Sequence, residues 1–109
     1  MTRRTIACIG ECMVEMCKKS DVQYEMAFAG DTANTAIYLS RLLNSSHHTV
    51  DYVTALGDDP YSSQIYNFLN SENVCTTQTR RLDGEMPGIY FIETDNEGER
   101  SFYYYRSAA

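Results

Sequence analysis

The sequence predicts an α/β fold in which helices flank a parallel sheet, together with a separate antiparallel β-hairpin. Two short, mainly apolar runs, Thr5–Ile9 and Val50–Leu56, each end directly before a glycine, as buried strands of a parallel sheet often do. A stretch with apolar residues at helical spacing comes after each run, so strand and helix alternate. The last third is instead rich in Ile, Phe and Tyr on both sides of a turn, which is typical of a hairpin.

Length and charge restrict the classes of function. A chain of 109 residues makes one domain or part of one, because independent domains usually run to about 100 to 150 residues, and a second domain is excluded. Nine Lys and Arg against fifteen Asp and Glu give a net charge of -6, which argues against nucleic acid or an anionic membrane as the partner. A small anionic ligand stays open, because one well-placed Arg overrides the overall sign locally.

The first segment predicts three strands. Thr5–Ile9 is expected near the centre of the parallel sheet, buried on both faces. Met13–Cys17 and Tyr24–Ala29 flank the polar turn Lys18–Asp21 and are expected to be short strands.

Helical spacing of apolar residues from Ala33 to Leu43 predicts the first helix. Asp31 or Thr32 is expected to cap it, because both side chains accept hydrogen bonds from free backbone N–H groups. Gly30 then lies at the junction between a loop and the helix.

The second helix has the stronger start signal. Asp59 is a favourable N-cap residue, and Pro60 suits the first helical position. The apolar stripe of this helix consists of Tyr61, Ile65, Phe68 and Leu69. Val74–Thr79 is expected to add a third strand to the parallel sheet.

The hairpin is predicted from Gly88–Thr94 and Ser101–Arg106, with Asp95–Gly98 as its turn. Its two arms alternate so that both faces of the ribbon carry aromatic rings. One of those faces needs another part of the molecule to cover it.

The cysteines and histidines predict no metal site. Cysteines at positions 8, 12, 17 and 75 match no zinc spacing and form no CxxC pair, so reduced thiols are expected. His47 and His48 are adjacent and are expected in a surface loop. The apolar run at Ile6–Ile9 is too short for a signal peptide, and we expect a cytoplasmic location.

Four stretches in a fixed order resemble a known family: Ile9–Glu15, Ala29–Ala36, Thr54–Pro60, and Pro87–Thr94 followed by Gly98–Arg106. In these stretches the chain resembles the PfkB, or ribokinase-like, sugar kinases, and within them the kinases of 2-keto-3-deoxygluconate. Each stretch alone is weak evidence for the resemblance, but four of them in this order are specific for the family. Together they span nearly the whole chain.

The resemblance implies a ribokinase-like α/β fold, in which a parallel sheet with flanking helices carries a small β lid over the sugar. The lid strands are expected near residues 13–29 and 87–106. The family transfers the γ-phosphoryl group of ATP to a sugar hydroxyl, which implies ATP and Mg²⁺ as cofactors. By the same resemblance, the catalytic base, the anion hole and most of the ATP site lie beyond Ala109. We therefore expect an N-terminal segment of a longer kinase and assign no catalytic residue within it.

Gly30, Asp31 and Asn34 are the first candidate substrate-binding residues. Glycine at a helix N-terminus lets a ligand approach the backbone, where free N–H groups favour oxygen-rich ligands. Capping by Asp31 and a satisfied polar role for Asn34 are the alternatives, which the residues alone leave open. The resemblance of the Gly-Asp-Thr-Ala-Asn stretch favours ligand contact.

Tyr90, Tyr104 and Arg106 complete the candidate site. The tyrosines lie on opposite arms of the hairpin, where they either face a sugar, as the resemblance implies, or pack one arm on the other. Arg106 ends an apolar arm, and its guanidinium needs either a substrate carboxylate or a nearby acid as its partner. Glu15 loosely matches an acid that holds sugar hydroxyls in the wider family, and is otherwise a solvated strand residue.

The expected function of the complete protein is ATP-dependent phosphorylation of 2-keto-3-deoxygluconate to its 6-phosphate. The alternatives are another kinase of the family, acting on ribose or fructose, and a non-catalytic sugar-acid-binding or interaction module. Arg106 argues against a neutral sugar, which needs no guanidinium. The expected partner is a small sugar acid rather than nucleic acid or a membrane, and a homo-oligomer through the β lid stays open.

Overall fold

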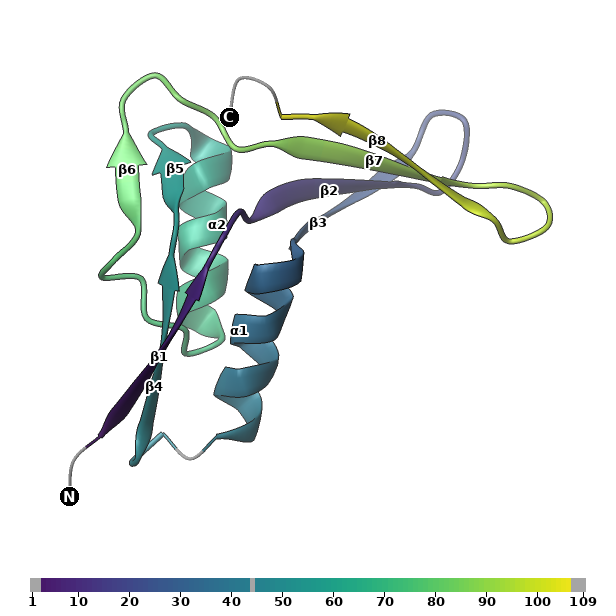
Figure 1. The fold of residues 1–109 in the computed structure, drawn as a ribbon. Helices are drawn as coiled ribbons and strands as arrows, with labels where there is room; N and C mark the ends of the chain where they lie inside the picture. The colour runs from purple at the N-terminus through teal and green to yellow at the C-terminus, as the bar shows by residue number, and fades with distance from the viewer. Residues whose placement is uncertain (1–2, 44, 107–109) are drawn as a thin grey trace.

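The computed structural model describes residues 3–43 and 45–106. In chain order its elements are β1 (Arg4–Ile9), β2 (Met13–Lys18), β3 (Tyr24–Ala29), α1 (Asp31–Leu42), β4 (His48–Val53), β5 (Ala55–Gly57), α2 (Pro60–Ser71), β6 (Arg80–Leu82), β7 (Ile89–Thr94) and β8 (Arg100–Tyr105). Both helices and the strands β1, β4, β5 and β6 make an α/β body, from which β2, β3, β7 and β8 extend to one side (Figure 1). This projection explains a radius of gyration of 15.4 Å, against about 13 Å for a compact chain of similar length.

The predicted parallel pairing is present between β1 and β4, which align from Arg4 opposite His48 to Ile9 opposite Val53. The expectation that β1 is central and buried on both faces is wrong for the described residues. Only β4 pairs with β1 among them, and the side chain of Ile9 is 70% exposed. The core to which α1 and α2 contribute meets β1 only through the partly buried Cys8.

One hydrophobic core joins the two helices to β4 and to the beginning of β2. Its buried members are Cys12, Val14, Ala33, Ala36, Ile37, Val50, Tyr52, Leu56, Ile65, Leu69 and Val74. The presence of residues from both the α/β body and β2 in this set means that the base of the four-stranded sheet is packed onto the body. The rings of Phe28 on β3 and Phe68 on α2 add to this junction, with centroids 5.6 Å apart.

The apolar run at residues 50–56 forms two strands instead of the single predicted one. β4 pairs with β1 while β5 pairs with β6, and the carbonyl of Thr54 between them accepts a hydrogen bond from the Arg80 N–H at 3.0 Å. The predicted strand Val74–Thr79 is reduced to an isolated bridge between Asp51 and Cys75. The backbone turns there, because the Thr76 carbonyl accepts a hydrogen bond from the Thr79 N–H at 3.0 Å, and the Tyr52 carbonyl accepts one from the Thr79 hydroxyl at 2.9 Å. His48 begins β4 and is not in a loop.

The two helices begin differently. Asp59 caps α2 as predicted, accepting hydrogen bonds from the N–H groups of Tyr61 and Ser62, and Pro60 follows it. The predicted cap of α1 is wrong, because Gly30 occupies the N-cap position and no side chain caps this helix. Thr32 is instead engaged with the sheet, where its hydroxyl lies 2.9 Å from that of Tyr52.

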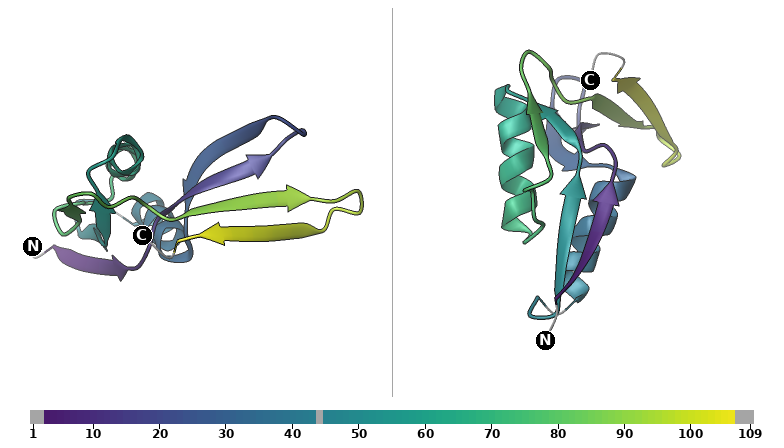
Figure 2. Two further views of the ribbon diagram at one scale, coloured as in Figure 1. Left: turned by 90° about the horizontal axis from the view of Figure 1, so that it is seen from above. Right: turned by 60° about the vertical axis from the view of Figure 1, so that its left-hand side comes forward.

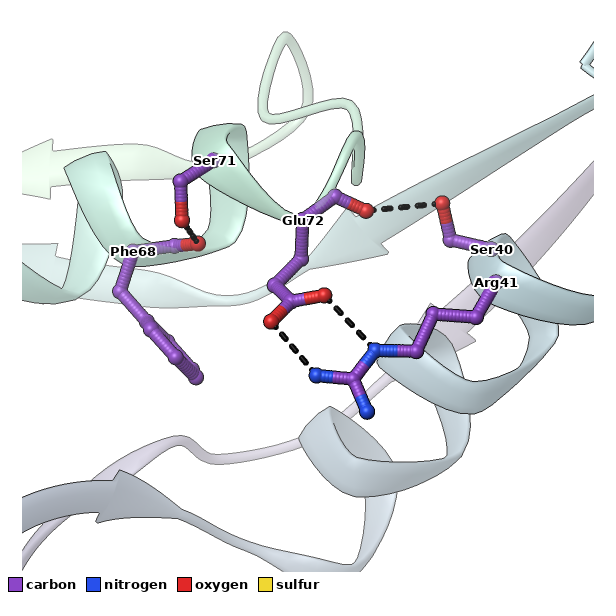
Figure 3. Close-up of polar contacts among 5 residues, drawn as sticks. All are labelled: Ser40, Arg41, Phe68, Ser71 and Glu72. Atoms are coloured by element: carbon purple, nitrogen blue, oxygen red, sulfur yellow. Dashed lines mark hydrogen bonds and ion pairs between the residues drawn. The ribbon is translucent and has the colours of Figure 1, made fainter.

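The C-terminal ends of α1 and α2 are tied together by one glutamate (Figure 3). Arg41 donates two hydrogen bonds to the Glu72 carboxylate, at 2.9 and 2.7 Å, and the Ser40 hydroxyl donates to the Glu72 carbonyl at 2.9 Å. The hydrogen bond from Arg41 lowers the pKa of Glu72 below its usual value. This paired geometry fixes the distance between the two helix ends.

The four-stranded sheet has the order β3-β2-β7-β8 and contains all the strands predicted near residues 13–29 and 87–106. β7 and β8 form the predicted antiparallel hairpin, and β2 runs parallel to β7. Seen from above, these strands continue well beyond the helices (Figure 2). Neither α1 nor α2 has the length and apolar character needed to cross a membrane.

Candidate functional site

A pocket of about 420 Å³ lies where the four-stranded sheet meets the start of α1. This volume falls within the range of about 300 to 1,000 Å³ that is usual for small-molecule sites. All six predicted site residues are among those that line it, which are Gly10, Glu11, Met13, Gly30, Asp31, Thr32, Asn34, Tyr90, Phe102, Tyr104 and Arg106. The fold therefore brings together residues of β7, β8 and α1 with Gly30 just before α1 and Arg106 just after β8, which are 76 positions apart.

Gly30 allows the start of α1 to approach the loop after β1. A Cβ atom at this position would lie 2.4 Å from the carbonyl oxygen of Glu11, so any side chain would force the two segments apart. The Gly30 carbonyl accepts the first hydrogen bond of the helix, from the Asn34 N–H at 2.8 Å. Asp31 is exposed and caps nothing, so the capping alternative is excluded, and Asp31 lines the pocket.

Tyr90 and Tyr104 face each other across β7 and β8. Their ring centroids are 5.6 Å apart and their planes differ by 27°, which is a stacked arrangement. Tyr90 is almost fully buried, and its hydroxyl donates to Glu15 Oε1 at 2.5 Å. Tyr104 is 53% exposed. Packing between the arms therefore holds Tyr90, whereas Tyr104 presents much of its ring to the pocket.

Arg106 lies at the edge of the pocket between an acid and an aromatic ring. Its Nη1 is 3.7 Å from Glu11 Oε1, and its guanidinium carbon is 5.1 Å from the ring centroid of Tyr104. The nearby acid considered from the sequence is thus present. Both partners are about half exposed, however, and exposed ion pairs contribute only about 0 to 1 kcal/mol. Glu11 therefore holds the Arg106 guanidinium only weakly.

Several lining residues were not identified from the sequence. Side chains two residues apart on a strand point to the same face. Met13 therefore shares a face with Glu15, and Phe102 shares one with Tyr104, so strand alternation could have identified both lining residues. Glu11 carries no such signal. Its carboxylate lies next to Gly88, where a Cβ would lie 2.9 Å from Glu11 Oε2 and 2.8 Å from Arg106 Cβ.

The cysteine beside the pocket is not a reactive one. Cys12 is 1% exposed, and burial raises the pKa of its thiol to about 12, with a smaller contribution from Glu11. A thiol with this pKa is neutral at physiological pH and therefore a poor nucleophile. All four cysteines are free thiols. The pocket is lined by carboxylate, amide, aromatic and guanidinium groups.

Comparisons with known proteins place the chain in a family. The model of the pfkB family carbohydrate kinases matches residues 3–109. The chain is 49% identical over 109 residues to the 2-dehydro-3-deoxygluconokinase of Dickeya dadantii, covering 100% of this chain and 35% of that protein. It is 46% identical over 106 residues to the enzyme of the same name from Escherichia coli (strain K12), covering 97% of this chain and 34% of that protein.

Solved structures show the same fold. A fructokinase from Xylella fastidiosa with bound ATP superposes with a TM-score of 0.83 at 28% identity, covering 96% of this chain and 31% of that one. A 2-dehydro-3-deoxygluconokinase from Thermotoga maritima superposes with a TM-score of 0.84 at 21% identity, covering 98% and 33%. The chain thus spans about a third of the length of the curated relatives it matches. By family model and by sequence identity, it belongs to the pfkB family of carbohydrate kinases.

Proposed function

We propose that this chain supplies the sugar-binding part of a kinase that phosphorylates 2-keto-3-deoxygluconate, also called 2-dehydro-3-deoxygluconate, to its 6-phosphate. The observation that carries the proposal is the half-exposed guanidinium of Arg106 at the edge of a pocket that also offers hydroxyl-binding groups. A sugar acid has both a carboxylate and several hydroxyls. The names of the relatives from Dickeya dadantii and Escherichia coli support the same substrate.

Each end of the substrate has a matching group in the pocket. Arg106 can hold the carboxylate with two parallel N–H bonds, taking it in place of Glu11. Asp31 accepts hydrogen bonds from hydroxyls, and Asn34 both donates and accepts. The exposed ring of Tyr104 covers the carbon chain between them. The proposed role of this chain is therefore to bind and orient the sugar acid.

ATP and Mg²⁺ are proposed to bind mainly to residues outside this chain. Kinases of this family use ATP, and when bound it supplies the transferred phosphoryl group. The pocket residues fit a sugar acid better than a nucleotide, since two of them, Glu11 and Asp31, are acids and a single cation, Arg106, lies among them. The proposed domain assignment is an N-terminal segment whose β2–β3 and β7–β8 hairpins form a lid over the sugar.

A kinase for a neutral sugar, fructose or ribose, is the alternative within the family. Arg106 distinguishes the two, because a guanidinium contributes most when it meets a carboxylate. We also propose a cytoplasmic location, in keeping with four free cysteines.

Replacement of Arg106 by Lys in a full-length kinase tests the proposed substrate. Lys keeps the charge but loses the paired N–H geometry, and charge-assisted contacts of this kind are worth about 1.5 to 3 kcal/mol. We expect kcat/KM for 2-keto-3-deoxygluconate to fall roughly ten- to a hundred-fold, with the KM for ATP unchanged. An equal loss with fructose would contradict the carboxylate role and favour the neutral-sugar alternative.

A homo-oligomer is proposed through the lid. The face of the sheet opposite the pocket carries Tyr103 and Tyr105, which are 51% and 70% exposed. Covering exposed aromatic rings with a second copy would remove apolar surface from water. Sedimentation of the full-length protein with both tyrosines replaced by Ser should show a shift to a smaller species, and an unchanged species would exclude this face.

A further inference from the structure

Glu15 lies in a row of residues that crosses the whole four-stranded sheet. It is opposite Ala27 on β3 and Tyr90 on β7, and Tyr90 is opposite Tyr104 on β8. Facing residues on neighbouring strands point to the same side, so this row lies on the face that borders the pocket. Glu15 itself is not among the residues that line the pocket.

The carboxylate of Glu15 is bound to a tyrosine hydroxyl. Tyr90 donates to Glu15 Oε1 at 2.5 Å, and the side chain of Tyr90 is only 8% exposed. Burial, and then the neighbouring carboxylate, raise the pKa of Tyr90, so its hydroxyl stays protonated and remains a donor. With its hydroxyl used in this way, Tyr90 offers the pocket its ring and not its oxygen.

The orientation of Tyr90 affects the residues that are proposed to contact the substrate. Its ring stacks on Tyr104 with centroids 5.6 Å apart, and the guanidinium carbon of Arg106 lies 5.1 Å from the Tyr104 ring. Tyr104 is 53% exposed, so its stacking on buried Tyr90 is a main constraint on where its ring lies. Without Glu15, Tyr90 loses its hydrogen-bond acceptor. The positions of Tyr90, of the Tyr104 ring and of the Arg106 guanidinium are then less well fixed.

We propose that Glu15 is a positioning residue for sugar-acid binding, which acts by holding Tyr90, and through Tyr90 the Tyr104 ring and the Arg106 guanidinium. The inference rests on the proposed function, in that the pocket takes a sugar acid. It differs from a role in which Glu15 itself binds sugar hydroxyls. A carboxylate already engaged by Tyr90 and outside the pocket lining is poorly placed for that second role.

A double-mutant cycle in the full-length kinase tests the inference. Glu15→Ala removes the acceptor and Tyr90→Phe removes the donor while keeping the ring. We expect each to raise the KM for 2-keto-3-deoxygluconate about tenfold with a smaller change in kcat, since loss of positioning weakens binding of the acid. The double variant should be no worse than either single variant. Glu15→Gln keeps an acceptor and should recover most of the affinity.

Glu93→Ala is the matched control. Glu93 is a glutamate of the same sheet that pairs with Lys18 at 3.4 Å and lies outside the row. Its loss breaks an ion pair without affecting Tyr90, so the KM should stay at the wild-type value. A drop in thermal stability alone, with an unchanged KM in Glu15→Ala, would overturn the positioning role.

Two further outcomes separate this inference from the proposed function. If the increases in KM of the two single variants multiply in the double variant, Glu15 contacts the sugar independently of Tyr90. That result would overturn the inference and leave the proposed function intact. If the wild-type kinase fails to prefer the acid over fructose, the proposed function fails instead. Near-ultraviolet circular dichroism of the tyrosines still tests the anchor in that case. Glu15→Ala and Tyr90→Phe should both change it, Glu93→Ala should not, and an unchanged spectrum in Glu15→Ala would overturn the inference.

Discussion

The hydroxyl of Thr32, in the first turn of α1, lies 2.9 Å from the hydroxyl of Tyr52, which is fully buried in β4. Thr32 also sits against Gly10, where a Cβ atom would lie within 2.2 Å of the Thr32 Oγ1. These two contacts attach the start of α1 to the sheet. Because Asp31 precedes Thr32 and faces the pocket, the contact between Thr32 and Tyr52 also determines where the pocket begins.

Replacing Tyr52 by Phe removes this contact and leaves the Thr32 hydroxyl without it. We expect the free energy of unfolding to fall by about 1 kcal/mol, which is the usual net value of one buried hydrogen bond. Denaturant midpoints measure the change. Tyr38→Phe is a suitable control, because Tyr38 is 61% exposed and should leave the midpoint where it was. Equal midpoints for wild type and Tyr52→Phe would contradict a stabilising role for the contact.

Asp59→Ala should lower the free energy of unfolding by about 0.5 to 2 kcal/mol without changing the fold. The carboxylate accepts hydrogen bonds from the N–H groups of Tyr61 and Ser62, at 3.0 and 3.1 Å, and from the Ser62 hydroxyl. Alanine has no side-chain acceptor for any of these three hydrogen bonds. Chemical denaturation followed by far-ultraviolet circular dichroism checks this, with the exposed Asp83→Ala as the control. A midpoint that stays unchanged would remove Asp59 as the effective cap.

The same cap should make stability depend on pH. Burial alone would raise the pKa of Asp59, but hydrogen bonds from Ser62 and Tyr61 outweigh it and hold the pKa below the ordinary value of 3.8. A folded-state pKa below the unfolded one gives stability that is complete above the unfolded pKa and is lost as the pH falls through the folded value. The difference in stability between wild type and Asp59→Ala should therefore shrink as the pH falls below about 4. A constant difference down to low pH would contradict this.

Gly88→Ala should impair sugar-acid binding more than it impairs folding. The added Cβ would lie 2.8 Å from Arg106 Cβ and 2.9 Å from Glu11 Oε2. Arg106 must then move, and a shift of about 1 Å in a binding group can cost about a hundred-fold in rate. Steady-state kinetics of the full-length kinase should show a raised KM for the acid.

Gly98→Ala provides the opposite case. Gly98 has a φ of +83° and nothing within 4 Å of an added Cβ. Alanine there costs roughly 1 to 2 kcal/mol of backbone strain while remaining far from the pocket. We expect reduced stability with unchanged kinetics. If Gly88→Ala showed the same pattern as Gly98→Ala, the close approach at Gly88 would have no role in binding.

Local chemistry in the sequence was enough to predict many elements. Polar turns flanked by residues of high β propensity located β2, β3, β7 and β8, because turn residues and β-branched or aromatic residues act within a few positions of the chain. Asp59 before Pro60 located the start of α2, since a cap depends on residues within one turn of it. The six candidate site residues all line one pocket, and their selection depended on resemblance to a family as well as on the residue types.

Tertiary structure decided what depends on distant partners. Gly30 and not Asp31 or Thr32 is the N-cap of α1, because Thr32 is held by Tyr52, twenty positions away. The core to which both helices contribute meets β1 only through Cys8, so no residue of β1 is buried, whereas its apolar sequence predicted burial on both faces. Likewise, the bond between Glu15 and Tyr90 exists only because β2 and β7, which are 75 positions apart at these residues, lie side by side. Side-chain type sets what a residue can bind, but only the pairing of strands determines which partner it meets.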